Sequence, residues 1–282
     1  MQKSVLITGA SSGFGLVACE AFLAQNWRVL AAIRGGKERE ALFTDLLARF
    51  PSRMEIVELD LLDNASIDRL YHTAQAHAPL DALINNAGYG LFGSIEDTSD
   101  ESLRKQMEVN FFGTVKLTQK LLPLLRHSQG VVLTVSSILG RHAFPLTGGY
   151  CASKFAVEGF MESLSAEVKP FGIKAYILEP GAFPTGFGSS LDWTLPLPSS
   201  PYLKATVGYQ RLRLKISEKN KGKSLTPVGK KMVHLVTNRP FGLRHAVGSD
   251  AVATVWIARL VPANLFHQVL SAVINKLQRR QA

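Results

Sequence analysis

The sequence predicts a doubly wound α/β fold, in which a parallel sheet is covered by helices on both faces. Three observations predict it. Up to residue 180, short apolar runs rich in β-forming residues alternate with stretches of helical pattern. The runs are largely apolar, as expected of parallel strands that are buried on both faces. The first run leads directly into a glycine-rich turn that opens a helix.

The strands and helices of this pattern alternate along the chain. Strands are expected at 4–8 (SVLIT), 28–33 (RVLAAI), 54–59 (MEIVEL), 82–84, 131–135 (VVLTV) and 174–178 (KAYIL). Helices are expected at 14–25, 38–50, 65–76, 103–125 and 149–168, and Pro51 ends the second of these. Right-handed crossovers between such units give one doubly wound sheet.

The alternation stops after Gly181. Residues 183–240 hold many of the prolines, serines and lysines, and one helix is expected there at 205–219. A long excursion that follows the sixth strand lies at the carboxyl edge of the sheet, where open α/β sheets bind ligands. We therefore expect a substrate lid. The segment 241–282 should close a single domain, 1–282, with helices at 252–260 and 264–277 and a short strand at 245–247.

The length and composition suit one large α/β domain. The chain has 282 residues, of which 46% are hydrophobic and 19% are charged. Its two cysteines and the lack of metal-type Cys/His spacing predict neither a disulfide framework nor a metal site. The N-terminus starts a strand at once, and no apolar run approaches the roughly 18 residues that span a bilayer. These features favour a cytoplasmic protein without a transmembrane segment.

The net charge of +10 leaves several kinds of anionic partner open: nucleic acid, an anionic cofactor or lipid headgroups. The positive residues are not gathered into one tract, so we do not expect nucleic acid to be a partner. The densest basic region is 211–231. It is either a solvated loop or a patch that attracts anions. The tail 273–280 (VINKLQRR) is read as a plain amphipathic closing helix, with contact to a membrane surface as the alternative.

The turn TGASSGFG between the first strand and the first helix has the form of a phosphate cradle. Gly9 permits the tight turn, Gly13 lets the backbone approach a pyrophosphate, and Gly15 allows close packing of the helix on the strand. The start of the helix supplies unpaired N–H donors and the positive end of its dipole. The residues expected to contact a dinucleotide here are Gly9, Ser11, Ser12, Gly13, Phe14 and Gly15.

The end of the second strand predicts which dinucleotide is bound. An acidic residue there binds the ribose hydroxyl of NAD, whereas an arginine accommodates the 2′-phosphate of NADP. Arg34 lies 19 positions after Gly15, where the acid would stand, so the expected cofactor is NADP(H). Ser12 could add a hydroxyl to the same phosphate. Asp60, followed by Leu61, ends the third strand and could accept a hydrogen bond from the adenine amino group, or it could cap the next helix.

Five motifs in order carry a resemblance to a known family. They are TGASSGFG, then NNAG at 85–88, Ser137 thirteen residues before Tyr150, Lys154, and Pro180-Gly181 after the sixth strand. Together they resemble a short-chain dehydrogenase/reductase of the single-domain branch with a Rossmann fold. The resemblance covers nearly the whole chain and is weakest in 183–240. The overall organisation is similar to that of steroid- and retinol-dehydrogenase-like members.

The resemblance implies a catalytic set. Tyr150 would exchange a proton with the carbonyl or alcohol oxygen, and Lys154 would lower the pKa of Tyr150 and hold the nicotinamide ribose. Ser137, rather than its neighbour Ser136, would hydrogen-bond the substrate oxygen. Asn110 matches the asparagine that kinks the long helix and supports a water relay to the lysine.

The resemblance also implies further cofactor contacts beyond the glycine turn. Thr185 would reach the nicotinamide carboxamide. The residues expected to line the cofactor are Asn86, Ala87, Gly88, Tyr150, Lys154, Pro180, Gly181, Phe183 and Thr185.

The residues near the expected reaction centre are largely apolar, which suits a hydrophobic carbonyl or alcohol such as a steroid, a retinoid or a simple aliphatic or aromatic compound. The expected substrate contacts are Ser137, Leu139, Phe144, Tyr150 and Phe187. Alternatives remain: a reductase of small aldehydes or ketones, a catalytically silent protein that senses NADP(H), and an isomerase with bound NAD(P). Helices 103–125 and 149–168 resemble those through which family members form homo-dimers or homo-tetramers.

Overall fold

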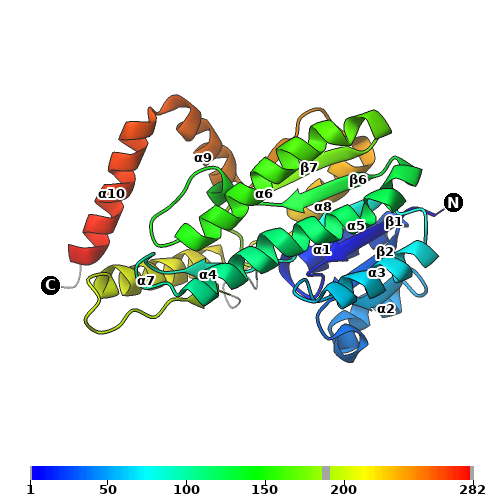
Figure 1. Cartoon of the computed structure of the whole chain (residues 1–282), viewed down its shortest axis with the longest axis horizontal. Helices are drawn as coiled ribbons and strands as arrows, with labels where there is room; N and C mark the ends of the chain where they lie inside the picture. The colour runs from blue at the N-terminus through cyan, green and yellow to red at the C-terminus, as the bar shows by residue number, and fades with distance from the viewer. Residues whose placement is uncertain (1, 186–190, 280–282) are drawn as a thin grey trace.

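The computed structural model describes residues 2–185 and 191–279, and its centre is one sheet of parallel strands (Figure 1). The order across this sheet is β3-β2-β1-β4-β6-β7-β9, which confirms the predicted doubly wound fold. The strands are β1 (Ser4–Thr8), β2 (Arg28–Ile33), β3 (Met54–Glu58), β4 (Ala82–Asn85), β6 (Val131–Val135), β7 (Lys174–Pro180) and β9 (Arg244–Val247).

Helices cover both faces of the sheet. On β1 the side chains of Val5 and Ile7 lie in one core cluster, while that of Leu6 lies in the other. The first cluster is covered by α1 (Gly13–Ala24), the 3-10 helix η1 (Gly36–Phe43), α2 (Thr44–Arg49) and α8 (Thr226–Asn238). The second is covered by α3 (Asn64–Ala76), α5 (Gly113–Ser128) and α6 (Gly148–Glu167), which is followed by the short η4 (Lys169–Phe171).

Two predicted helices are divided in the structure. The helix expected at 38–50 is a 3-10 segment followed by α2, because Arg39 leaves helical dihedral angles. The helix expected at 103–125 is α4 (Asp100–Met107), a π-helical turn η2 (Glu108–Phe112) and α5 in succession. A single π turn of this kind inside a helix is often found at a functional site.

Helix α8 lies in a segment for which the sequence analysis expects no helix. Its residues Val228, Met232 and Leu235 are fully buried in the first core cluster. Gly229 lets the helix approach α1 closely, since a Cβ there would lie 2.6 Å from the carbonyl oxygen of Val17. The end of α7 (Leu203–Asn220) and the start of α8 carry the basic region 211–231, so most of this region is helical.

A second group of elements lies beyond the carboxyl edge of the sheet. It contains a small parallel pair, β5 (Gly90–Phe92) with β8 (Leu191–Trp193), and the helices α7 (Leu203–Asn220), α9 (Ser249–Leu260) and α10 (Ala263–Arg279). Figure 1 shows α9 and α10 extending away from the sheet, with the end of α10 returning to α7. Among the described residues, no helix is both long and apolar enough to cross a membrane.

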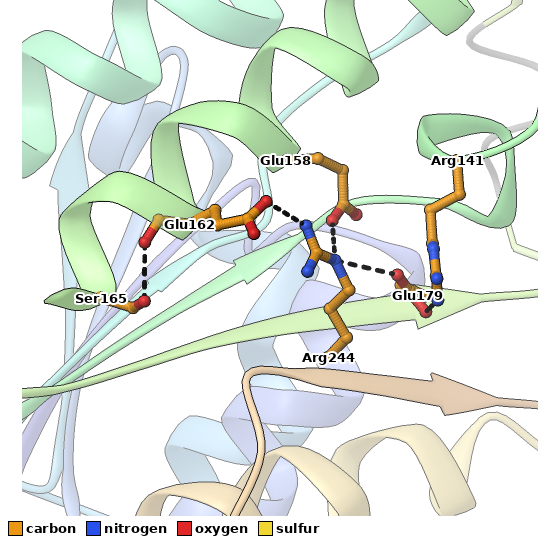
Figure 2. A network of polar contacts seen from close by, with 6 residues as sticks. All are labelled: Arg141, Glu158, Glu162, Ser165, Glu179 and Arg244. Atoms are coloured by element: carbon orange, nitrogen blue, oxygen red, sulfur yellow. Dashed lines mark hydrogen bonds and ion pairs between the residues drawn. The ribbon is translucent and has the colours of Figure 1, made fainter.

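A network of buried charges fixes β7, α6 and β9 to one another (Figure 2). The guanidinium of Arg244 lies 2.8 Å from a carboxylate oxygen of Glu158, 2.9 Å from one of Glu162 and 3.9 Å from one of Glu179. Arg141 lies 3.6 Å from the other oxygen of Glu179, whose side chain is only 1% exposed. Burial and the charge of Glu158 raise the pKa of Glu179, and the two arginines oppose that rise.

We predict that Arg244→Met lowers the free energy of unfolding by about 3 kcal/mol, because it leaves the carboxylates of Glu158 and Glu179 buried with too little positive charge. Urea denaturation at neutral pH measures this. Arg104→Met is the control, since Arg104 and its partner Asp100 are both largely exposed and their loss should leave the unfolding curve unchanged. Equal curves for both variants would contradict the stabilising role of the network.

Candidate active site

The turn after β1 is a close-packed loop of glycines. Gly9 and Gly13 have positive φ angles of 63° and 53°, which favour glycine. A Cβ on Gly15 would lie 2.2 Å from the carbonyl oxygen of Gly9, so no larger residue fits. Ser12 precedes α1 but its side chain forms no capping hydrogen bond, which leaves the first N–H groups of the helix available to an anion. The expected contacts Ser11 and Phe14 belong to the same turn.

The turn after β4 is joined to the glycine turn. The side-chain amide of Asn86 donates to the carbonyl oxygens of Thr8 and Gly9, at 2.9 and 3.2 Å. The backbone N–H groups of Asn86 and Ala87 both donate to the Thr8 hydroxyl, at 2.9 Å each. Asn86 therefore holds the backbone of the glycine turn, which the sequence analysis did not foresee. Gly88 follows on the side of the reaction centre.

The predicted adenosine side lies at the ends of β2 and β3. Arg34 is exposed directly after β2 and pairs with no carboxylate in the described part of the chain. One Asp60 oxygen accepts a hydrogen bond from the N–H of Leu62 at 2.9 Å. Asp63 caps α3 instead of Asp60, so the alternative assignment of Asp60 as the helix cap is wrong. Leu61 is buried beside Asp60.

Helix α6 and the end of β6 bring the predicted reacting groups together. Tyr150 and Lys154 lie one turn apart on α6, and both are buried. Ser137 follows β6, and its hydroxyl lies close enough to Tyr150 to lower the pKa of that tyrosine. The Lys154 ammonium donates to the carbonyl oxygen of Val135 at 2.8 Å and lies 5.9 Å from the centre of the Tyr150 ring. Ser136 is also buried, but its hydroxyl has no partner, so the geometry favours Ser137 for contact with substrate.

Burial dominates the titration of both groups. It raises the pKa of Tyr150 to about 12, although the hydrogen bond from Ser137 and the positive charge of Arg213 act in the opposite direction. Burial also lowers the pKa of Lys154 to about 8, against a smaller opposing effect of Glu158. Burial outweighs the effects that lower the pKa of Tyr150, and the expected lowering of that pKa by Lys154 stays a prediction.

Asn110 lies in the π-helical turn η2, as expected of an asparagine that kinks the long helix. Its side chain bonds distant groups rather than its own helix. The amide nitrogen donates to the carbonyl oxygen of Tyr89 at 2.9 Å and to the Ser153 hydroxyl at 3.1 Å, and the amide oxygen accepts from the Tyr89 N–H at 3.1 Å. A Cβ on Gly88 would lie 3.0 Å from this oxygen and 3.8 Å from Lys154 Nζ. Asn110 and Lys154 thus border the same small volume.

The segment after β7 is held by a residue to which the sequence analysis assigned no role. Asp250, at the start of α9, accepts a hydrogen bond of 2.6 Å from the N–H of Ala182. A Cβ on Gly181 would lie 2.2 Å from the same carboxylate, which explains the glycine after Pro180. The ring of Phe183 meets that of Phe14 edge to face, at 5.5 Å between centroids. The segment expected to line the nicotinamide therefore lies against the glycine turn.

Apolar side chains surround Tyr150 on the side away from the sheet. The cluster contains the predicted contacts Leu139 and Phe144, and Phe92 and Trp193, which the sequence places near the reaction centre and in the lid. It also contains Tyr209, which sequence reasoning did not assign to the site. Phe144 stacks on Tyr209 at 5.7 Å between centroids. The predicted contact Phe187 lies outside the described residues, whereas Thr185 is described and its N–H donates to the Phe183 carbonyl.

The cysteines and the potential metal ligands suggest no second chemistry in this part of the chain. Cys151 is buried beside Tyr150, its sulfur lies 3.1 Å from the Thr147 hydroxyl, and burial raises the pKa of its thiol, which disfavours the nucleophilic thiolate. Burial likewise raises the pKa of Cys19. Within 2–185 and 191–279, no group of three or more His, Cys, Asp or Glu residues is placed to hold a metal ion.

Comparison with known proteins agrees with this geometry. A family model described as short chain dehydrogenase matches residues 3–194. The uncharacterized oxidoreductase YusZ of Bacillus subtilis (strain 168) is 36% identical over 275 residues, which cover 95% of this chain and 97% of the relative. Retinol dehydrogenase 5 of Homo sapiens is 34% identical over 290 residues, covering 96% of this chain and 89% of the relative.

A solved structure is similar over the whole length. The short-chain dehydrogenase of Streptomyces avermitilis has a TM-score of 0.80 and 32% identity, and the alignment covers 100% of this chain and 99% of that chain. The family model matches well over half of the chain, and its motifs meet at one edge of the sheet. The chain therefore belongs to the short-chain dehydrogenase/reductase family and is an oxidoreductase that acts on alcohol or carbonyl groups.

Proposed function

We propose that the protein is an NADP(H)-dependent oxidoreductase that interconverts a carbonyl and a primary or secondary alcohol on a hydrophobic substrate. The observation that carries the proposal is the convergence of Ser137, Tyr150 and Lys154 at the carboxyl edge of the sheet, where all three are buried and Lys154 is hydrogen-bonded to the end of β6. A bound nicotinamide would supply or accept the hydride, and the protein must supply orientation and a proton.

In the proposed mechanism Tyr150 is the general acid and base. During reduction its hydroxyl donates a proton to the carbonyl oxygen, while Ser137 donates a hydrogen bond to the same oxygen as negative charge develops there. The tyrosine then recovers a proton through the volume around Gly88 that Asn110 and Lys154 border, which is where a water relay would run. Oxidation of an alcohol follows the same route in reverse.

The preference for NADP(H) rests on the end of β2. Arg34 stands at the position where an acidic residue would select NAD, and it is exposed and free of carboxylate partners within the described chain. Gly35, the residue after Arg34, has a φ of 78°. The side chain of Arg39 lies against it, since a Cβ built on Gly35 would be 3.2 Å from the Cδ atom of Arg39. Arg39 is therefore a second cation beside the expected 2′-phosphate position, and it was not singled out from the sequence.

The hydrophobic substrate rests on the aromatic side chains around Tyr150 and on the full-length similarity to a retinol dehydrogenase. Phe92 meets the Tyr150 ring edge to face at 5.7 Å between centroids. Such walls suit a retinoid, a steroid or another largely apolar carbonyl compound. A catalytically silent protein that senses NADP(H) is disfavoured, since a protein without turnover has no need of the Asn110, Ser137, Tyr150 and Lys154 set.

We predict that Tyr150→Phe lowers the rate of NADPH oxidation by about 10²-fold or more, because it removes only the proton that the reaction requires. A panel of aldehydes, ketosteroids and retinal provides the substrates, and binding of NADPH should stay unchanged. Tyr71→Phe is the control, since Tyr71 lies on α3 beside Lys120 and away from the site. Unchanged activity of Tyr150→Phe would refute the mechanism, and absence of turnover by the wild type would favour the silent protein.

We predict that the wild type gains stability over Lys154→Met as the pH rises. The pKa of Lys154 is about 8 in the folded chain, below its ordinary value of 10.5. Between these values the unfolded chain binds a proton that the folded chain does not, so the free energy of unfolding rises with pH. Urea denaturation from about pH 7.5 to about pH 10, without cofactor, measures the difference.

The control for this pH series is Lys105→Met, at an exposed position of α4. Below the folded pKa the buried ammonium destabilises the wild type, and that penalty disappears toward the unfolded pKa. Tyr150 has an ordinary pKa of 10.0 and a folded pKa of about 12, so it lowers the stability of both proteins near pH 10, and its effect cancels in the difference between them. A constant difference between the wild type and Lys154→Met over the whole range would show that the buried lysine stays fully charged.

We predict that Arg34→Ala removes a preference for NADPH over NADH. Loss of a charge-assisted contact to the 2′-phosphate should weaken NADPH binding about 10- to 100-fold and leave NADH binding unchanged. Titration by nicotinamide fluorescence measures both affinities, and Arg69→Ala on α3 is a control for the loss of a surface arginine. Equal affinity of the wild type for the two cofactors would exclude the assignment.

A further inference from the structure

Helix α7 lies along the candidate site with one face turned inward. On this face Ala205, Thr206, Tyr209 and Asn220 are buried. Tyr209 belongs to the aromatic cluster around Tyr150, while the Asn220 side chain donates to the carbonyl oxygen of Ala182, beside the expected nicotinamide segment. The helix therefore spans the site from the substrate end to the cofactor end.

Arg213 lies on the same face of α7. It follows Tyr209 by four residues and precedes Asn220 by seven, which are the separations that keep side chains on one side of a helix. Its guanidinium lies 5.7 Å from the centre of the Phe92 ring, and the Phe92 and Tyr150 rings are in edge-to-face contact. A positive charge thus stands inside an otherwise apolar and aromatic group of side chains.

In the described residues, no carboxylate is paired with the positive charge of Arg213. Arg213 forms no ion pair within 2–185 and 191–279, and its Nε atom is buried without a hydrogen-bond partner. The contrast with Arg141 and Arg244 is direct, because both of these partly buried arginines lie beside buried glutamates. Arg213 is partly buried, and burying part of a guanidinium without a carboxylate beside it is unfavourable unless a ligand supplies the negative charge.

We infer that Arg213 binds an anionic group of the substrate, so that the natural substrate is an apolar carbonyl or alcohol compound that also carries a carboxylate. The guanidinium can hold a carboxylate through two parallel hydrogen bonds, while the aromatic side chains hold the apolar part. The inference rests on the proposed function for the reacting group, and it narrows the substrate class from hydrophobic compounds to amphipathic acids such as oxo- or hydroxy-carboxylates.

A purely electrostatic role of Arg213 on the catalytic tyrosine makes a different prediction. The positive charge lowers the pKa of both Tyr150 and Tyr209, against the larger effect of burial. If this were its function, loss of the charge would slow charged and neutral substrates alike and would shift the pH profile of kcat. An anchor for a carboxylate affects only substrates that carry one.

The test compares acids with their methyl esters. The substrates are 4-oxopentanoate, 5-oxohexanoate and 7-oxooctanoate, each beside its methyl ester, with the full chain and NADPH. At one or more chain lengths the acid should exceed its ester at least about tenfold in kcat/KM, as expected of a charge-assisted hydrogen bond. Arg213→Gln should abolish that preference, with a loss for the acids at least about tenfold larger than any loss for the esters, while Arg213→Lys should retain part of it. Arg211→Gln, at an exposed position of the same helix, is the matched control.

Two results would overturn the inference: no preference for any acid in the wild type, or an equal loss for acids and esters in Arg213→Gln. The second result would assign Arg213 to the tuning of Tyr150. Binding of the same acids to Tyr150→Phe loaded with NADP⁺, followed by tryptophan fluorescence, separates this failure from failure of the proposed function. Acid binding that requires Arg213, in a protein without any turnover, would uphold the anion site and refute the proposed reaction.

Discussion

The hydrogen bond from the Lys154 ammonium to the Val135 carbonyl is the contact on which the arrangement of the site depends. It joins the middle of α6 to the end of β6, and it therefore sets the tyrosine one turn earlier on the helix against the serine that follows the strand. A free carbonyl at a strand end needs a donor, and the lysine satisfies it without exposing the strand to water. The same bond brings the ammonium beside Gly88, at the turn that carries the NNAG sequence.

This contact requires a charge to be buried, and the surrounding structure is organised around that requirement. Glu158 lies one turn after Lys154 and raises the pKa of the lysine against the effect of burial. Glu158 is in turn paired with Arg244 of β9, which also lies near Glu179 of β7. Glu179 directly precedes Pro180, so the ion network ends where the segment expected to line the nicotinamide begins. Stability and the position of the reacting groups are therefore maintained by the same buried charges, and neither can be altered alone.

The cofactor side of the molecule could be predicted from the sequence because its backbone conformations admit few residues. Glycine is required at position 9 by a positive φ angle, and at position 15 because a Cβ would collide with the carbonyl oxygen of Gly9. The strands are apolar runs, and a buried strand admits few other residue types. Helix α8 was missed although Val228, Met232 and Leu235 recur at helical spacing, because a proline and a glycine stand in its first turn and the surrounding segment is rich in turn-forming residues. Its identity as a core helix comes from packing on α1, which is a tertiary property.

The substrate side could be predicted less well for a related reason. Asp250 and Arg213 act across large separations in the sequence, and nothing in their neighbours distinguishes them from a helix-start acid and a surface arginine. Their importance arises from the groups that the fold places beside them: a glycine that leaves room for a carboxylate, and aromatic rings that surround a guanidinium. Single residues of α7 can therefore change the groups that surround Tyr150 while the strands and the glycine turn stay as they are, because these belong to other core clusters than Tyr209 of α7.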